Sequence, residues 1–166
     1  MRTLTSISGT PSPRIGRASL GTTLRLIRTR RTAPSLDPVK ALAARLTGAA
    51  RVYASPGHSL DEAWYGELAR LIHQRGGLDP AGARRHNAAI LASGDRRTAL
   101  ATVGLPTLVL HGQADPLVTL AGGRATAATI PGAKLITLPG MGNDLPRPLW
   151  PSVTGAIRAL ADTADT

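Results

Sequence analysis

The sequence predicts an α/β protein in which a short parallel sheet is flanked by helices and joined to a separate helical region. Between residues 34 and 94, apolar side chains recur at the three- and four-residue spacing of helices. Beyond residue 99, two short apolar runs alternate with two helical patterns in the order β-α-β-α. That order requires a crossover connection, so the two strands are expected to be parallel neighbours.

The first 33 residues form a basic segment rich in Ser, Gly and Pro. A short strand fits Leu4–Ile7, and Gly9, Pro11 and Pro13 end it. Residues 1–51 hold ten Lys and Arg against the single acid Asp37, so most of the net charge of +10 lies here. The arginines before that acid include Arg14, Arg17, Arg25, Arg28, Arg30 and Arg31. Three interpretations stay open: a solvated, poorly ordered segment, an organellar transit peptide, or an arm for phosphate-bearing partners.

Residues 34–98 are predicted to form three helices. The first starts at Asp37-Pro38, a capping side chain followed by proline in the first turn, and Gly48 is expected to end it. Ser59 and Glu62 have the spacing of a capping box, which predicts the start of the second helix. Asp79-Pro80 repeats the cap-plus-proline pattern and starts the third.

Residues 99–166 carry the predicted β-α-β-α unit. The strands are expected at 105–110 and 133–138, and the helices at about 120–130 and 148–160. Polar loops follow both strands: Asp115 lies after the first and Asn143 after the second. Because the carboxyl ends of parallel strands meet at one edge of a sheet, these two side chains are expected to share a cleft.

Together these segments resemble the C-terminal half of an α/β hydrolase close to the aclacinomycin methylesterase-like group. The resemblance covers the chain from about residue 58 to its end, while residues 8–33 are more basic than it implies. The matching residues are Leu4–Ile7, Asp79-Pro80, Ala88–Asp95, Pro106–Gly112, Ala114–Val118, Gly122–Thr126, Ile130–Ala133, Gly140–Gly142 and Asp144–Pro146. It implies a partial α/β-hydrolase fold, with residues 34–98 as a helical cap over the site and residues 99–166 as the C-terminal portion.

The resemblance assigns Asp115 to the catalytic acid and places Asn143 where the family has its catalytic histidine. An asparagine amide has no titrating nitrogen and takes no proton from a serine near neutral pH. Loss of the base lowers the turnover of a serine hydrolase on the order of a millionfold. The nucleophile motif Gly-x-Ser-x-Gly occurs nowhere; the nearest pattern, Gly16–Gly21, has one residue too many. We therefore expect a truncated or degenerate carboxylic-ester hydrolase, a pseudoenzyme that is inactive as this chain alone.

Trp64 and Tyr65 have two open uses, packing in the core or lining a substrate pocket. No His, Asp or Glu residues have convincing metal-ligand spacing and no phosphate loop is present, so neither a metal nor a cofactor is expected. The expected partner is a small-molecule ester once the site is completed. Because a half sheet leaves an unpaired edge, a second copy or the missing N-terminal half is also expected there.

A second function class stays open: a non-catalytic binding protein that uses the basic N-terminal arm on nucleic acid or an anionic surface. An aromatic content of 2% argues against a platform that stacks bases. No apolar run reaches the ~18 residues of a membrane span, and the N-terminus lacks the apolar stretch of a signal peptide, so the expected location is the cytoplasm.

Overall fold

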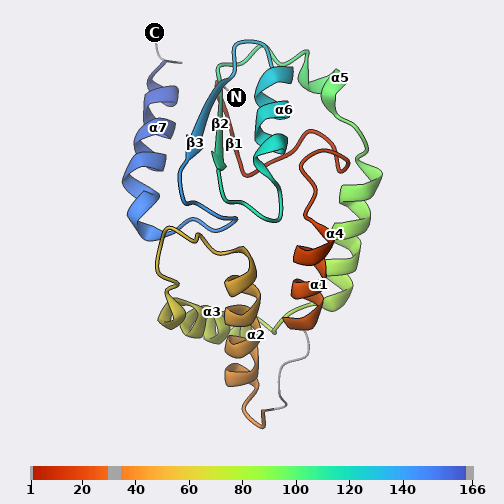
Figure 1. The fold of residues 1–166 in the computed structure, drawn as a ribbon, viewed down its shortest axis with the longest axis vertical. Helices are drawn as coiled ribbons and strands as arrows, with labels where there is room; N and C mark the ends of the chain where they lie inside the picture. The colour runs from red at the N-terminus through yellow and green to blue at the C-terminus, as the bar shows by residue number, and fades with distance from the viewer. Residues whose placement is uncertain (1, 30–34, 164–166) are drawn as a thin grey trace.

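The computed structural model describes residues 2–29 and 35–163. Its sheet has three strands, β1 (Leu4–Ile7), β2 (Thr107–Gly112) and β3 (Lys134–Leu138), in the spatial order β1-β2-β3. Both outer strands run parallel to β2 (Figure 1). The predicted α/β class with a short parallel sheet is therefore confirmed. The short strand predicted at Leu4–Ile7 is the third strand of this sheet.

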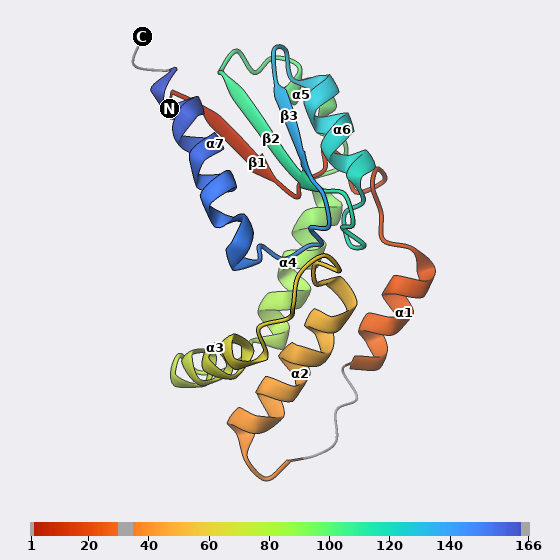
Figure 2. The same cartoon turned by 60° about the vertical axis from the view of Figure 1, so that its left-hand side comes forward.

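The core lies on β2, where all six residues are buried. Successive side chains of a strand point to opposite faces, so Leu108 and Leu110 pack against α7 (Trp150–Asp162) while Val109 and His111 face α6 (Leu120–Thr129). Figure 2 shows these two helices on opposite sides of the sheet. The buried cluster on the α7 side consists of Leu108, Leu110, Leu138, Met141 and Val153.

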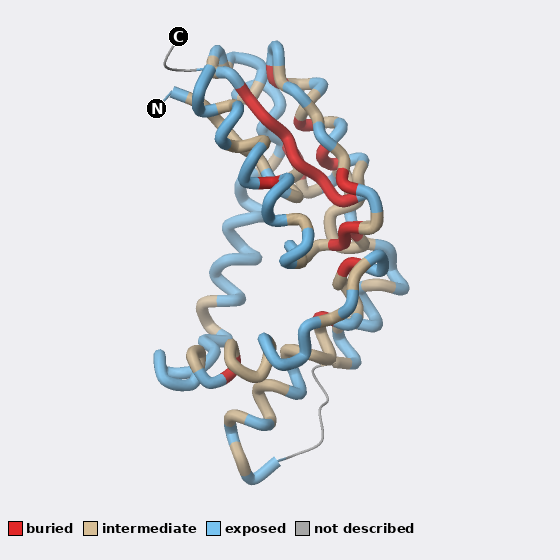
Figure 3. Tube along the Cα trace, turned by 90° about the vertical axis from the view of Figure 1, so that its left-hand side faces the viewer, coloured by how far each residue is buried: buried red, intermediate tan, exposed pale blue. Residues whose placement is uncertain are grey.

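Four longer helices gather at the other end of the molecule, which is the lower end in Figure 1. They are α1 (Leu20–Thr29), α2 (Pro38–Tyr53), α3 (Glu62–Gln74) and α4 (Pro80–Ala92). Within their described residues, only Ala50 and Ala69 are buried. Figure 3 shows this contrast, with burial concentrated along the central strand and mostly exposed helices below it.

Helix starts follow the predicted caps in two of three cases. Asp37 and Asp79 cap α2 and α4 with their carboxylates. The predicted capping box was wrong, because Asp61, and not Ser59, accepts the hydrogen bond from the Trp64 N–H at the start of α3. A carboxylate directly before the helix reaches that N–H, whereas Ser59 lies two residues farther back.

Helix ends and the first segment show further differences. Helix α2 continues through Gly48 to Tyr53, because a glycine costs only about 1 kcal/mol inside a helix. Helix α1 was not predicted, although Ser19 caps it and Leu20, Leu24 and Ile27 have helical spacing. Two short elements were also not predicted, α5 (Arg97–Leu100) and the 3-10 turn η1 (Arg147–Leu149).

Strand β2 begins at Thr107, two residues later than expected. The proline at 106 has no N–H for the ladder, and its carbonyl accepts the Leu4 N–H.

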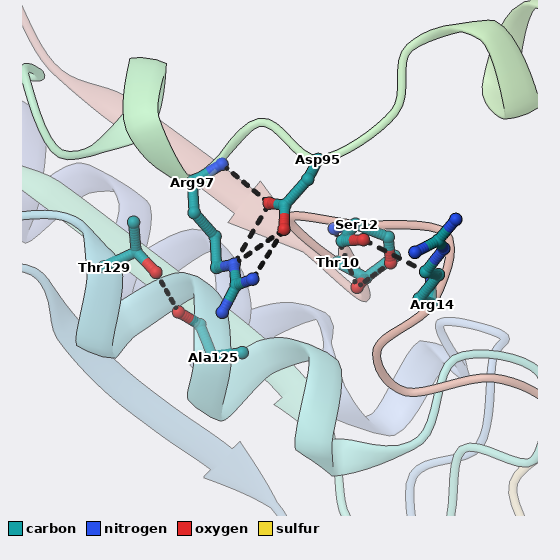
Figure 4. A network of polar contacts seen from close by, with 7 residues as sticks. All are labelled: Thr10, Ser12, Arg14, Asp95, Arg97, Ala125 and Thr129. Carbon is teal, nitrogen blue, oxygen red and sulfur yellow. Dashed lines mark hydrogen bonds and ion pairs between the residues drawn. The ribbon is translucent and has the colours of Figure 1, made fainter.

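The loop between β1 and α1 is folded against the domain. The Thr10 hydroxyl donates to the carbonyls of Ser12 and Ile15 at 2.9 and 2.8 Å, and the Arg96 N–H donates to the Pro11 carbonyl at 2.9 Å. Figure 4 shows this loop beside the Asp95–Arg97 pair. The segment is therefore ordered as far as residue 29; Arg30 and Arg31 lie outside the described residues. The domain division at residues 33/34 and 98/99 stays a prediction.

No helix in the described ranges combines the length and the apolar character needed to cross a membrane.

Candidate functional site

The loop after β2 holds the Asp115 carboxylate in one orientation. Its Oδ1 accepts the backbone N–H groups of Leu117 and Val118 at 2.8 and 2.9 Å. The side chain is completely buried. Two fixed donors on one oxygen leave Oδ2 pointing toward the loop that follows β3, so the acid can engage one further partner there.

That partner is Asn143. Its Nδ2 donates to Asp115 Oδ2 at 2.7 Å, and its backbone N–H donates to the carbonyl of Tyr53, the last residue of α2, at 2.8 Å. The two loops approach closely because Gly112 has no side chain: a Cβ there would collide with the Met141 carbonyl. The structure thus brings together the two residues that the sequence placed at one sheet edge.

The arrangement has the form of an acid that orients the next group in a catalytic triad. An imidazole in this place would be held by the carboxylate and would be stabilised as a cation. The Asn143 amide is held in the same way, but it neither accepts nor releases a proton. The geometry of an acid–base pair is therefore present, whereas its proton acceptor is not.

His111 does not replace the missing base. It is completely buried, and its Nε2 lies 2.7 Å from the Val118 carbonyl and 3.7 Å from Asp115 Oδ2. Its Nδ1 has no hydrogen-bond partner and faces Gly123 of α6. With one nitrogen on a backbone carbonyl and the other against a helix, the ring holds the acid loop in shape and reaches no substrate.

The segment after α2 contacts the Asn143 loop on both sides. The Ser55 hydroxyl donates to Asp144 Oδ1 and accepts the Gly142 N–H at 2.8 Å. A Cβ on Gly142 would collide with the Tyr53 carbonyl, so the glycine permits this contact. Ser55 was missed in the sequence, because a small residue between Ala54 and Pro56 carries no pattern that indicates a long-range hydrogen bond.

Known proteins resemble this chain over its whole length. A family model described as TAP-like protein matches residues 88–160. An esterase, RhEst1 from Rhodococcus sp. ECU1013, covers 98% of this chain with 56% of its own, at a TM-score of 0.58 and 16% identity. The 2-hydroxy-6-oxo-6-phenylhexa-2,4-dienoate hydrolase from Rhodococcus sp. strain RHA1 gives a TM-score of 0.62 at 14% identity, over 97% of this chain and 55% of its own.

The enol-lactonase from Burkholderia xenovorans LB400 gives a TM-score of 0.59 at 20% identity, over 98% of this chain and 55% of its own. The chain has the α/β fold of these hydrolase structures. It spans a little over half the length of the structures it matches. The resemblance inferred from the residues after β2 and β3 is therefore confirmed at this level, while the finer methylesterase-like group stays a prediction.

A cavity of about 330 Å³ opens beside the Asn143 loop. It is lined by both predicted substrate residues, Trp64 and Tyr65, and by Asp144. Arg147 and Trp150 also line it and were missed in the sequence, because they lie in a proline-rich stretch around the start of α7. The structure thus places the two aromatic residues at a pocket and not in the core; Trp64 is 43% exposed.

Both tyrosines of the chain, Tyr53 and Tyr65, are within reach of the Asp144 charge. Burial raises the pKa of Tyr53, and burial, followed by the neighbouring Tyr53 and the Asp144 charge, raises the pKa of Tyr65 to about 12. Tyr65 therefore keeps its proton at neutral pH and offers the pocket a neutral phenol. Among residues 2–29 and 35–163, no three His, Asp or Glu side chains gather as metal ligands would.

Proposed function

We propose that this chain supplies the acid loop and the cap of a carboxylic-ester hydrolase, with a base position that has lost its proton acceptor. The observation that carries the proposal is the 2.7 Å hydrogen bond from Asn143 to the buried carboxylate of Asp115. A loop that had lost its function without constraint would have no reason to keep this contact. The nucleophile and the oxyanion donors would come from protein outside residues 1–166, packed beside the open edge of β1.

The proposal predicts that a single change restores a working acid–base pair. In Asn143→His, the introduced imidazole would donate a ring N–H to Asp115 Oδ2 and be stabilised as a cation, which raises its pKa above the usual value of about 6.5. NMR titration of the ring proton measures this pKa. The matched control is Asn143→His combined with Asp115→Asn, in which the pKa should fall. Equal values in the two variants would contradict the proposed pair.

The same variant tests ester chemistry without a serine. An imidazole oriented by a carboxylate attacks an activated ester itself: its nitrogen bonds to the acyl carbon, p-nitrophenolate leaves, and water hydrolyses the acyl-imidazole. We expect Asn143→His to hydrolyse p-nitrophenyl acetate about tenfold faster than the unchanged chain, with a pH profile that follows the imidazole pKa. If addition of Asp115→Asn left this rate unchanged, the carboxylate would have no role.

A second candidate function, binding of nucleic acid or an anionic surface, is favoured by two arginines. Arg14 and Arg17 line a cavity of about 590 Å³ together with Asp95, and neither forms a close ion pair within the described residues. The nearby Asp95 is taken by Arg97, whose Nη2 lies 2.6 Å from it (Figure 4). Binding of a single-stranded oligonucleotide that weakens steeply with salt, and is lost in Arg14→Ala/Arg17→Ala, would support this function; binding unaffected by both would exclude it.

A further inference from the structure

The cavity beside the Asn143 loop contains a guanidinium that contacts two indole rings. Trp64 comes from α3 and Trp150 from the start of α7, and Arg147 lies over both rings. The Arg147 Cζ lies 5.8 Å from the Trp64 ring centroid and 5.6 Å from the Trp150 centroid, within the range of cation–π attraction. The Trp150 N–H is fixed on the Leu145 carbonyl at 2.9 Å, so its ring is held in place. The protein's own guanidinium thus lies within cation–π range of both rings.

The charges of the cavity favour a further cation. Its lining carries the carboxylates of Asp61 and Asp144 against the single guanidinium of Arg147. Asp61 Oδ2 lies 3.6 Å from Arg147 Nε, but Asp144 is bound by the Ser55 hydroxyl and forms no ion pair within the described ranges. One negative charge is therefore left unbalanced, in a chain whose net charge is +10. An anionic ligand would meet two carboxylates here.

We propose that this cavity binds a small organic cation, a protonated or quaternary amine, whose charge takes the place of the Arg147 guanidinium over Trp64 and Trp150. The apolar part of the ligand would lie on Leu145 and Pro146, which also line the cavity.

A ligand cation can displace the Arg147 guanidinium from its place over the two rings. Its side chain is 63% exposed, and the 3.6 Å contact with Asp61 is a long ion pair between exposed groups, the kind that contributes little. A ligand amine keeps the favourable contacts with both rings and with Asp61, while the displaced guanidinium moves into water. The neutral phenol of Tyr65 adds a further ring without a competing charge.

The inference rests on the proposed function in one respect, that the bound cation is part of an ester substrate. Asp144 directly follows Asn143 in the chain, so an amine in the cavity would hold its ester near the base position. Binding of the amine is measured without any turnover, so failure of the cation site and failure of the ester chemistry are distinguished.

The experiment uses the two tryptophans of the chain as reporters, because both line this cavity. Tryptophan emission of the full chain is titrated with choline and with 3,3-dimethylbutan-1-ol, which has the same shape without the charge, at ionic strength matched with NaCl. We expect a saturable change with choline and at least tenfold weaker binding of the neutral alcohol.

Three variants sharpen the test. Arg147→Ala should tighten choline binding at least threefold, because the internal cation is removed, whereas an anion site would lose its ligand. Asp144→Asn, which keeps an acceptor for Ser55, should weaken binding severalfold. Arg158→Ala, which removes an exposed arginine of α7 outside the cavity, should change nothing. Circular dichroism confirms that each variant is folded.

Equal affinity for choline and the alcohol, weaker choline binding in Arg147→Ala, or saturable binding of acetate in place of choline would each overturn the proposal. If choline binds as expected while Asn143→His gains no esterase activity, the cation site stands and the ester function fails. If Asn143→His gains esterase activity while choline does not bind, only the cation site is refuted.

Discussion

The sheet and the four helices α1 to α4 are stabilised in different ways. Every residue of β2 is buried between helices, whereas α1 and α4 bury no residue at all. Hydrophobic burial is the dominant favourable term in folding, so the sheet unit has to carry most of the stability. The helices at the other end depend on caps, turns and a few polar contacts. The same substitution should therefore lower the free energy of unfolding much more in the sheet than in α1 to α4.

The largest contrast is expected between two leucines. Leu110 is 1% exposed in the core cluster, whereas Leu91 on α4 is 72% exposed. Leu110→Ala should lower the free energy of unfolding by roughly 2–5 kcal/mol, because it removes buried apolar contacts and leaves a cavity. Leu91→Ala should change it by less than about 0.5 kcal/mol. Urea denaturation measures both. Similar losses in the two variants would mean that α4 is covered in solution.

The acid loop should show the next largest effect. Asp115→Ala removes the acceptor of three donors, the N–H groups of Leu117 and Val118 and the amide of Asn143. Buried donors without an acceptor are costly, so we expect a loss of roughly 1–3 kcal/mol in urea denaturation. Asp95→Ala, at an exposed ion pair with Arg97, is the matched control and should cost clearly less. A smaller loss at Asp115 than at Asp95 would contradict the rigid loop described here.

The same contrast explains how much of the molecule could be predicted from sequence. Strand β2 was predicted because its apolar run is continuous and completely buried, whereas β3 and the last two helices were predicted from the spacing of their apolar residues. The contact between Asp115 and Asn143 was predictable because parallel strands bring their carboxyl ends together. Helix α1 was missed because its apolar residues lie between arginines and remain exposed. The basic composition of the segment therefore hid the helical spacing of these residues.

Long-range polar contacts of the site could not be predicted. Ser55 and Asp144 are 89 residues apart, and no local pattern relates them. Arg147 lies over both Trp64 and Trp150, which are far apart in the sequence but line one cavity. Such contacts depend on how the helical region is placed on the sheet, which short-range periodicity does not describe.

A smaller effect tests which residue begins α3. Asp61 accepts the Trp64 N–H at 2.9 Å, whereas Ser59 makes no capping hydrogen bond to this helix in the described structure. Asp61→Ala should cost about 1 kcal/mol, while Asp61→Asn, which keeps a capping oxygen, should cost less. Ser59→Ala should be close to neutral. Hydrogen exchange of the first turn of α3 shows where the stability is lost. Faster exchange in Ser59→Ala would support the capping box that the sequence predicted.

The smallest effect concerns the pH dependence near the pocket. The pKa of Tyr65 is raised from 10.0 to about 12, chiefly by burial, so the folded chain holds this proton at pH values where the unfolded chain releases it. The stabilisation is therefore complete below pH 10 and is lost as the pH rises toward 12. Absorbance at 295 nm should show both tyrosines ionising above pH 10, and Asp144→Asn should lower the midpoints because a neighbouring negative charge is removed. Normal midpoints in the folded chain would place both phenols in water and contradict their burial beside Asp144.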